Sequence, residues 1–336
     1  MKNPLDGFTV TREDLWFVGE DLQRPECILA EPDGSLWSAD ARGGVVHIRP
    51  DGTQALIAQN LDTRFGATLD EADRFTQGTL PNGLAFDVDG SILISNFGTD
   101  RLERMARDGR TNVVLDTIDG TPIGKVNFVL RDARGRIWLT ISTRIVNWMS
   151  AISPRYADGY VAVLDNDGAR IVADGFMFTN EIRFDAAEEW LYVVETTGRR
   201  ITRLRIGENA EVLARETFGP ADTGGFIDGI AFDAFGNLWG THVMSDRIFA
   251  ITPEGEFRVI LDDDNPEPSA ALYEAFERDA VTPNHMLACG GTIAPWFASV
   301  TFGGPDLRTV YIGSLRGNRI PAFRSPVAGL PMAHWR

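Results

Sequence analysis

The sequence has few of the features that stabilise a fold through covalent bonds or anchor it in a membrane. Only two cysteines, Cys27 and Cys289, occur in 336 residues. Two thiols are too few for a disulfide framework, so we expect a reducing compartment, the cytoplasm. No run of 18 apolar residues occurs, which argues against a helical membrane span. The first residues, from Met1 to Asp6, lack an apolar segment, so we expect no signal peptide.

Basic residues and histidines are also scarce. The chain has 32 Lys and Arg against 48 Asp and Glu, a formal net charge of −16. This balance argues against nucleic acid, whose phosphates require a basic surface. The four histidines share no spacing typical of a catalytic dyad. No nucleophile elbow, phosphate loop or dinucleotide fingerprint stands in a strand–helix context. The expected partner is therefore a small molecule.

What the chain does contain is one short pattern that recurs. A polar residue starts an apolar run, and eight residues later a turn leads into a second apolar strand. The paired positions are Glu26 and Gly34, Asn82 and Gly90, Asn127 and Gly135, Asn180 and Glu188, and Asp228 and Gly236. A sixth, weaker copy begins near Ser299. Six copies give about 56 residues each, enough for a four-stranded sheet, so the chain is predicted to be an all-β, six-bladed propeller.

The pattern also suggests how the chain is divided. We predict one propeller domain over residues 15–330, preceded by a loosely held arm, residues 1–14. The apolar stretch 15–18 precedes the first full unit and is expected to complete the last blade, because closure removes an exposed sheet edge. Two insertions, about 143–158 and 262–298, are expected to form lids on the face where the first strands begin.

In a propeller the first strand of each blade lines the central axis. The shared offset therefore predicts that five polar side chains meet at one mouth of the channel: Glu26, Asn82, Asn127, Asn180 and Asp228. Two carboxylates that converge without a cation repel each other. An all-oxygen set favours a divalent cation, Ca²⁺ first, with Mg²⁺ or Mn²⁺ possible and Zn²⁺ less favoured. The alternative is that Asn-Gly and Asp-Gly are ordinary turn residues.

Several of these segments resemble a known family. Pro25-Glu26, the unit at Asn180, residues 227–239 and the segment 302–307 are similar to gluconolactonase, regucalcin and luciferin-regenerating enzyme, and the resemblance covers roughly residues 15–330. It implies a six-bladed propeller with one catalytic divalent ion and, in many members, lactone hydrolysis. It further implies that Glu26, Asn180 and Asp228 are metal ligands. Asn127 would bind substrate or complete the metal shell, and Asp228 would be the general base or would orient the nucleophile.

The sequence departs from that family near the predicted site. Glu181 follows Asn180 where Gly is more usual, and we expect its side chain to face away from the ring. Phe128 follows Asn127 in place of Asp, and Lys125 stands where some members carry Arg. These changes affect the expected substrate more than the metal.

The expected substrate pocket adds side chains outside the ligand set. Lys125 and Asn82 would line it beside Asn127, under lid residues Trp148, Met149 and Trp296. The lid side chains either pack on one another or form an apolar roof for a bulky or aromatic lactone. Two other functions remain open. One is an organophosphate hydrolase of the diisopropyl-fluorophosphatase kind that uses Glu26, Asn127, Asn180 and Asp228, and the other is a metal-stabilised binding propeller without turnover.

Overall fold

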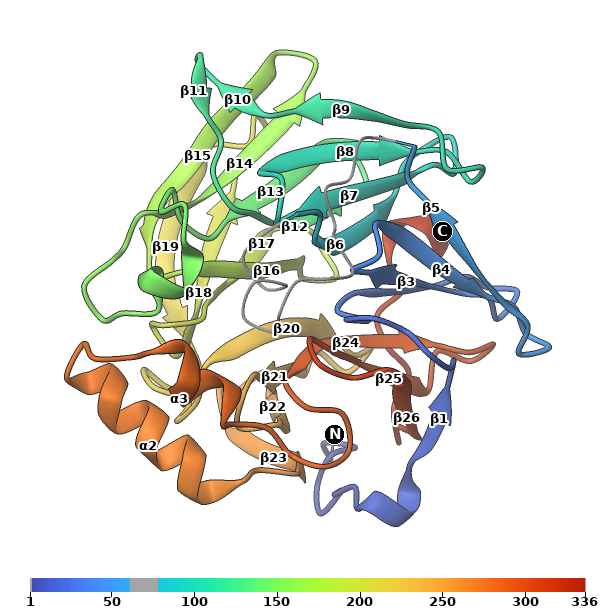
Figure 1. Cartoon of the computed structure of the whole chain (residues 1–336), viewed down its shortest axis with the longest axis vertical. Coiled ribbons are helices and arrows are strands. Elements are labelled where there is room, and N and C mark those ends of the chain that lie inside the picture. The colour runs from blue at the N-terminus through green and yellow to red at the C-terminus, as the bar shows by residue number, and fades with distance from the viewer. Residues whose placement is uncertain (1, 61–77, 336) are drawn as a thin grey trace.

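Six four-stranded antiparallel sheets stand around one axis in the computed structural model, which describes residues 2–60 and 78–335 (Figure 1). The predicted six-bladed propeller is confirmed. The first three blades consist of β2 (Ile28–Ala30), β3 (Leu36–Asp40), β4 (Gly44–Ile48) and β5 (Gln54–Ala58); β6 (Pro81–Phe86), β7 (Ile92–Asn96), β8 (Arg101–Met105) and β9 (Thr111–Leu115); and β12 (Val126–Arg131), β13 (Ile137–Ile141), β14 (Gly159–Asp165) and β15 (Gly168–Phe176). A small hairpin of β10 (Thr117–Ile118) and β11 (Thr121–Pro122) connects the second blade to the third.

The remaining blades follow the same order. They consist of β16 (Thr179–Phe184), β17 (Trp190–Glu195), β18 (Arg200–Ile206) and β19 (Val212–Phe218); β20 (Ile227–Phe232), β21 (Leu238–His242), β22 (Arg247–Ile251) and β23 (Phe257–Asp262); and β24 (Phe297–Gly303), β25 (Thr309–Ser314) and β26 (Ile320–Arg324) with β1 (Trp16–Val18). In every blade the strand at the start of the repeat is the innermost one, so the recurring polar residue stands beside the channel.

The N-terminal strand closes the ring, as predicted. β1 pairs antiparallel with β26, with Trp16 opposite Ala322 and Val18 opposite Ile320. This pairing covers the backbone edge that β26 would otherwise expose to solvent or to another chain. The last blade is thus built from both ends of the chain.

The N-terminal arm is held more firmly than expected. Leu5 and Val10 are buried, and the Val10 amide donates to the carbonyl oxygen of Ile260 at 2.7 Å. Asp6 also forms an ion pair with Arg258. The expectation of a loose arm was wrong because two apolar side chains insert beside the fifth and sixth blades and lose contact with water. A short 3₁₀ helix, η1 (Arg12–Asp14), then leads into β1.

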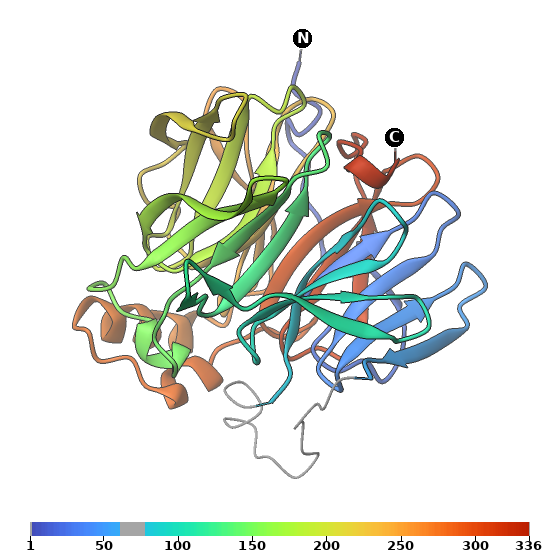
Figure 2. The same ribbon diagram turned by 90° about the horizontal axis from the view of Figure 1, so that it is seen from above.

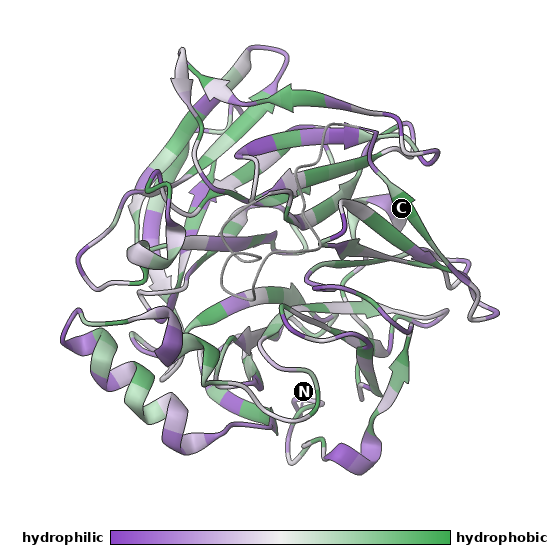
Figure 3. Cartoon of the chain, viewed as in Figure 1, coloured by the Kyte–Doolittle hydropathy of each residue, from purple (hydrophilic) through white to green (hydrophobic). Residues whose placement is uncertain are grey.

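Three blades share a buried tryptophan joined to the acidic residue six positions earlier. The indole N–H groups of Trp37, Trp138 and Trp239 donate to Glu31, Asp132 and Asp233 at 2.5, 2.9 and 2.9 Å. Each bond fixes the turn between the first and second strands against the blade core. Figure 3 shows apolar residues along the strands and polar residues in many of the connecting loops.

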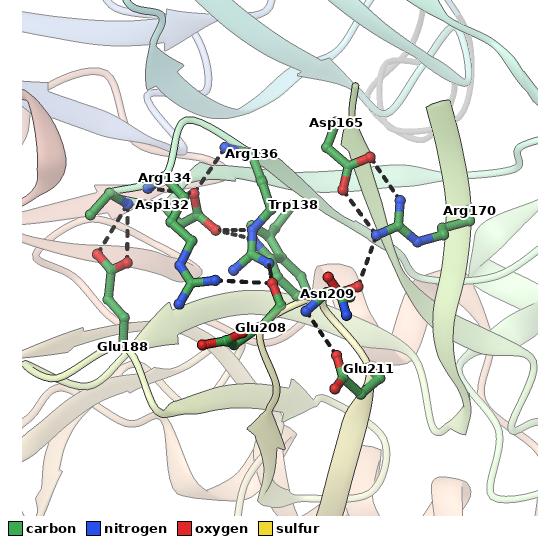
Figure 4. Close-up of polar contacts among 11 residues, drawn as sticks. Asp132, Arg134, Arg136, Trp138, Asp165, Arg170, Glu188, Glu208, Asn209 and Glu211 are labelled. Atoms are coloured by element: carbon green, nitrogen blue, oxygen red, sulfur yellow. Dashed lines mark hydrogen bonds and ion pairs between the residues drawn. The ribbon is translucent and has the colours of Figure 1, made fainter. Parts of the chain in front are cut away.

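The same turns connect neighbouring blades. Figure 4 shows Asp132 of the third blade with Arg136 and Trp138, while Glu188 of the fourth blade accepts the amide of Ala133. Arg134 also donates to the carbonyl oxygen of Glu208 at 2.9 Å. These contacts fix the two blades relative to each other on the face opposite the lids.

Both long insertions lie on the face opposite the two chain termini (Figure 2). The first carries η2 (Trp148–Ala151), and the second carries α2 (Pro266–Glu277) and α3 (Pro283–Leu287). Asp246 anchors the second insertion, because its buried carboxylate accepts the amides of Gly291, Trp296 and Phe297. In the part of the chain that is described, no helix is long and apolar enough to cross a membrane.

The C-terminal segment crosses the opposite face. Leu330 donates its amide to Phe232, and the Trp335 indole, in η3 (Ala333–Trp335), donates to the carbonyl oxygen of Ala30. The segment therefore ties the fifth blade to the first at the far end of the channel.

Candidate active site

The five recurring polar residues line one cavity at the lid face. Around them the cavity encloses about 520 Å³ of empty space, part of it open to solvent. Its other lining residues are Arg24, Phe97, Trp148, Ile152, Phe178, Thr196, Val243, Met244 and Leu315. The structure thus brings Glu26, Asn82, Asn127, Asn180 and Asp228 together from five different blades.

Local breaks in strand pairing direct these side chains toward the cavity. The pairing register of the innermost strand shifts at Asn82, Asn127, Asn180 and Asp228, each in its own blade. A bulge adds a residue on one strand and re-aims its side chain, which is why bulges recur beside active sites. All four residues lie inside strands, so they are not the ordinary turn residues of the alternative interpretation.

The glycines after two ring residues allow the inner strands to approach closely. A Cβ on Gly83 would lie 2.6 Å from the Phe128 ring, and one on Gly229 would lie 2.5 Å from the Ala298 carbonyl oxygen.

The sixth blade shows the same register shift between Phe297 and Val300. Its residue at the ring position is Ala298, which offers no side-chain oxygen, so one sector of the ring has no polar side chain.

Hydrogen bonds orient the ring and leave two of its oxygen atoms unused. Asn82 Nδ2 donates to Glu26 Oε1 at 3.1 Å and to the carbonyl oxygen of Asn127 at 3.0 Å. Asn180 Nδ2 donates to Thr196 Oγ1 at 3.2 Å. Among the described residues, Glu26 Oε2 and Asn180 Oδ1 are buried and have no hydrogen-bond partner. Such oxygens are costly to bury unless a donor or a cation binds them.

Burial raises the pKa of both ring carboxyls. The pKa of Glu26 lies well above its ordinary value, chiefly because of burial and then because of the neighbouring charge of Asp228. Burial raises the pKa of Asp228 to about 7, against the opposing effects of Arg24 and of a hydrogen bond from Asn180. Two buried acids that disfavour ionisation in the bare protein form a site that a divalent cation would stabilise.

The donor set fits a hard cation. Nowhere in residues 2–60 and 78–335 do three or more His, Cys, Asp or Glu side chains converge to hold a metal. The ring instead offers two carboxylates and amide oxygens, without nitrogen or sulfur ligands. That chemistry suits Ca²⁺, and it suits Mg²⁺ or Mn²⁺ better than Zn²⁺.

Glu181 does not line the cavity, but its charge reaches the ring. Its carboxylate is buried, pairs with Arg183 at 2.9 Å and accepts the amide of Ile230 at 3.2 Å. Burial raises its pKa to about 7 although the charge of Arg183 lowers it. Its charge also contributes to the raised pKa of Glu26. The side chain therefore points away from the mouth, as expected, and Arg183 balances it below the ring.

The predicted pocket residues separate into two groups. Asn82, Asn127 and Trp148 line the cavity. Lys125, Met149 and Trp296 do not. The Lys125 ammonium pairs with Asp100 at 2.9 Å, whereas Met149 and Trp296 are buried in the apolar cluster under the lids. For these three, a substrate-binding role stays a prediction; in this conformation Lys125 forms an ion pair, and Met149 and Trp296 have packing roles.

Arg24 is a charged cavity residue that sequence reasoning missed. Its Nη2 donates to Asn82 Oδ1 at 2.6 Å. It precedes the repeat and therefore has no counterpart at the shared offset. The apolar wall of Phe97, Phe178 and Met244 was missed for a related reason, because Phe97 and Met244 follow second strands and Phe178 precedes β16, all in loops outside the shared offset. A better signal would have been that these loops lie on the lid face.

A second cavity lies at the other end of the channel, below the C-terminal segment. It is lined by Arg131, Arg183 and Met332 among others. Both arginines already have partners, the carbonyl oxygen of Phe86 for Arg131 and Glu181 for Arg183. No convergent set of oxygens comparable to the ring lines this cavity in the described chain, so the lid-face cavity is the candidate active site.

Comparisons with known proteins give a consistent result. Residues 107–262 match the model of the SMP-30/Gluconolactonase/LRE-like region. The 6-deoxy-6-sulfogluconolactonase of Pseudomonas putida is 27% identical over 153 residues, which are 45% of this chain and 43% of that protein. The match thus spans less than half the length of that relative. The matched family region contains Asn127, Asn180 and Asp228 but not Glu26.

Two solved structures share the fold over nearly the whole chain. A gluconolactonase from Xanthomonas campestris aligns with a TM-score of 0.66 and 19% identity, covering 92% of this chain and 89% of that one. The calcium-binding protein regucalcin from Agrobacterium tumefaciens aligns with a TM-score of 0.67 and 15% identity, covering 95% and 98%. The family model, the relative and the shared fold together confirm that this propeller resembles the gluconolactonase, regucalcin and luciferin-regenerating enzyme family.

Proposed function

We propose that the protein is a divalent-metal-dependent lactonase, with Ca²⁺ as the preferred ion. The observation that carries the proposal is the convergence of two buried carboxylates and three amides, with Glu26 Oε2 and Asn180 Oδ1 left without partners among the residues that the structure describes. The names of the similar gluconolactonases and of the calcium-binding regucalcin support it. Two free, buried cysteines also support a reducing, cytoplasmic location.

The residues of the ring would divide the work. Glu26, Asn180 and Asp228 would hold the cation, with Asn127 completing its shell or contacting the substrate. The bound cation would supply Lewis-acid polarisation of the lactone carbonyl and stabilise negative charge on its oxygen. Asp228 would orient the attacking water and accept its proton. Phe97, Trp148 and Phe178 would exclude water from the apolar side of the ring.

The test is turnover by protein stripped with chelator and reloaded with Ca²⁺, Mg²⁺, Mn²⁺ or Zn²⁺, on lactones from sugar lactones to bulky aromatic ones. Wild type is expected to hydrolyse at least one lactone only when metal is present. Asp228→Asn should lose activity by 100-fold or more while it keeps its fold. Asp222→Asn, which removes a half-exposed surface carboxylate, is the control and should stay within twofold of wild type.

Other outcomes would favour the alternative functions. Hydrolysis of phosphotriesters but of no lactone would indicate an organophosphate hydrolase on the same ring. Tight metal binding without turnover of either class, with Asp228→Asn changing only affinity or stability, would indicate a binding propeller. Failure to bind any of the four ions would remove the basis of the proposal.

A further inference from the structure

Arg24 stands at the ring, yet its hydrogen bonds go to neutral groups. Nη1 donates to the carbonyl oxygen of Pro81 at 3.0 Å, and Nη2 donates to Oδ1 of Asn82 at 2.6 Å. In the described residues its Nε is buried without a partner. A guanidinium has five N–H groups, so three are not used by these bonds. Glu26 and Asp228 act on Arg24 only as nearby charges.

The backbone holds Arg24 in place at some cost. Its φ of 56° lies in the left-handed region, which a residue with a Cβ adopts unfavourably. Strain of this kind collects at functional sites, where surrounding structure enforces it. Here the conformation carries the side chain across to β6 of the second blade, where Pro81 and Asn82 fix it. The guanidinium is therefore oriented before any ligand binds.

The charges of the cavity suggest what Arg24 is for. Among the described residues that line the cavity only Glu26, Asp228 and Arg24 are ionisable, so this part of the lining carries one net negative charge when both acids are ionised. A bound divalent cation would reverse that to one net positive charge. A neutral sugar lactone leaves such a charge unbalanced, whereas a lactone with one anionic substituent balances it. Arginine is also the side chain best matched to planar or branched oxyanions.

We propose that Arg24 binds an anionic substituent of the substrate, a carboxylate or a sulfonate, so that the preferred lactones are acidic ones. This inference rests on the proposed lactonase function. Arg24 is a specificity residue in this scheme, since it contacts the substituent and not the reacting carbonyl.

The experiment compares lactones that differ in charge. D-glucono-1,5-lactone is neutral, D-glucaro-1,4-lactone carries a carboxylate, and 6-deoxy-6-sulfogluconolactone carries a sulfonate. Wild type, Arg24→Gln, Arg24→Lys and the control Arg155→Gln are assayed with metal. Arg155 lies on the lid, is largely exposed and pairs with Asp279, so its loss changes net charge equally without touching the cavity. Isothermal titration of D-glucarate and D-gluconate into each protein gives a readout independent of turnover.

Arg24→Gln is expected to lose about 10- to 100-fold in kcat/KM on at least one acidic lactone, mainly through KM, as fits loss of a charge-assisted hydrogen bond. The loss on gluconolactone should stay below threefold. Arg24→Lys should recover part of the loss, and Arg155→Gln should match wild type. The acidic lactone whose kcat/KM falls further in Arg24→Gln identifies the carboxylate or the sulfonate as the ligand.

Equal losses on neutral and acidic lactones, or no loss on either, would overturn the assignment of Arg24. If wild type hydrolyses none of the lactones, the lactonase proposal fails, and titration still decides the role of Arg24. Tighter binding of glucarate than of gluconate that disappears in Arg24→Gln would support anion binding without turnover, and equal binding of the two acids would refute it. Melting curves of both Arg24 variants exclude misfolding as the cause.

Discussion

Glu26→Gln is expected to stabilise the metal-free protein and to abolish its stabilisation by Ca²⁺. The glutamate side chain is buried and accepts one hydrogen bond from Asn82, and its second oxygen has no partner within residues 2–60 and 78–335. Glutamine keeps the shape and an oxygen for Asn82, but removes the charge that repels Asp228. The substitution therefore removes the charge repulsion in the metal-free ring, and it also removes one of the two anionic metal ligands.

The structure gives the size of the effect. Burial moves the pKa of Asp228 from 3.8 to about 7, which corresponds to roughly 4 kcal/mol of lost folding free energy at pH 8. The charge of Asp228 in turn contributes to the raised pKa of Glu26. Removal of the Glu26 charge should therefore stabilise the metal-free variant by about 1–3 kcal/mol, or about 1–4 °C in Tm for a chain of this size. Ca²⁺ at 100 times its Kd should add about 2.7 kcal/mol to wild type and almost nothing to the variant.

The pH dependence has a definite sign. In the metal-free fold Asp228 keeps its proton to a higher pH than in the unfolded chain. The free energy of unfolding should therefore fall as pH rises between about 4 and 7. Glu26→Gln should make this slope shallower.

The assay is calorimetric unfolding in EDTA and in excess CaCl₂ at several pH values. Glu181→Gln is the matched control, because Glu181 is buried nearby but pairs with Arg183. That variant leaves both anionic ligands of the ring in place and should keep the Ca²⁺ shift. A Glu26→Gln protein that is less stable than wild type in EDTA, or that keeps the full Ca²⁺ shift, would refute the reasoning.

Three further predictions concern the scaffold. Deleting residues 2–18 should lower the urea midpoint and cause concentration-dependent aggregation, seen by light scattering, because the edge of β26 becomes exposed; an unchanged midpoint would contradict this. Trp148→Ala should lower the free energy of unfolding in urea by about 3 kcal/mol and raise KM for bulky lactones, because the indole packs on Phe97 and Phe178. Unaltered stability and KM would show that the apolar wall is dispensable. Burial lowers the pKa of His242 to about 3, so between about pH 3 and 6.5 only the unfolded chain binds this proton. The free energy of unfolding should therefore fall as pH drops from about 6.5, by up to about 1.4 kcal/mol per pH unit. His242→Gln should flatten that decline, and parallel pH profiles of the variant and wild type would disprove the assignment.

The sequence by itself determined the number of blades, the closure of the ring and the ring of polar residues. Each of these depends on a local rule that repeats. A fixed offset of eight residues from Asn82 to Gly90, or from Asp228 to Gly236, places the polar residue at the same height on every inner strand. The apolar strand before the first unit had no other sheet to complete. Local strand geometry was therefore sufficient.

The tertiary structure alone decided which atoms of that ring are available and what else faces the cavity. In the described part of the chain, Glu26 Oε2 lacks a donor because Asn82, from another blade, bonds the other oxygen. Arg24 reaches the cavity through a left-handed turn that the repeat does not encode. Met149 and Trp296 pack under the lids because distant insertions meet there. Such contacts join segments far apart in sequence, so they form only when the blades pack together, and no local sequence pattern specifies them.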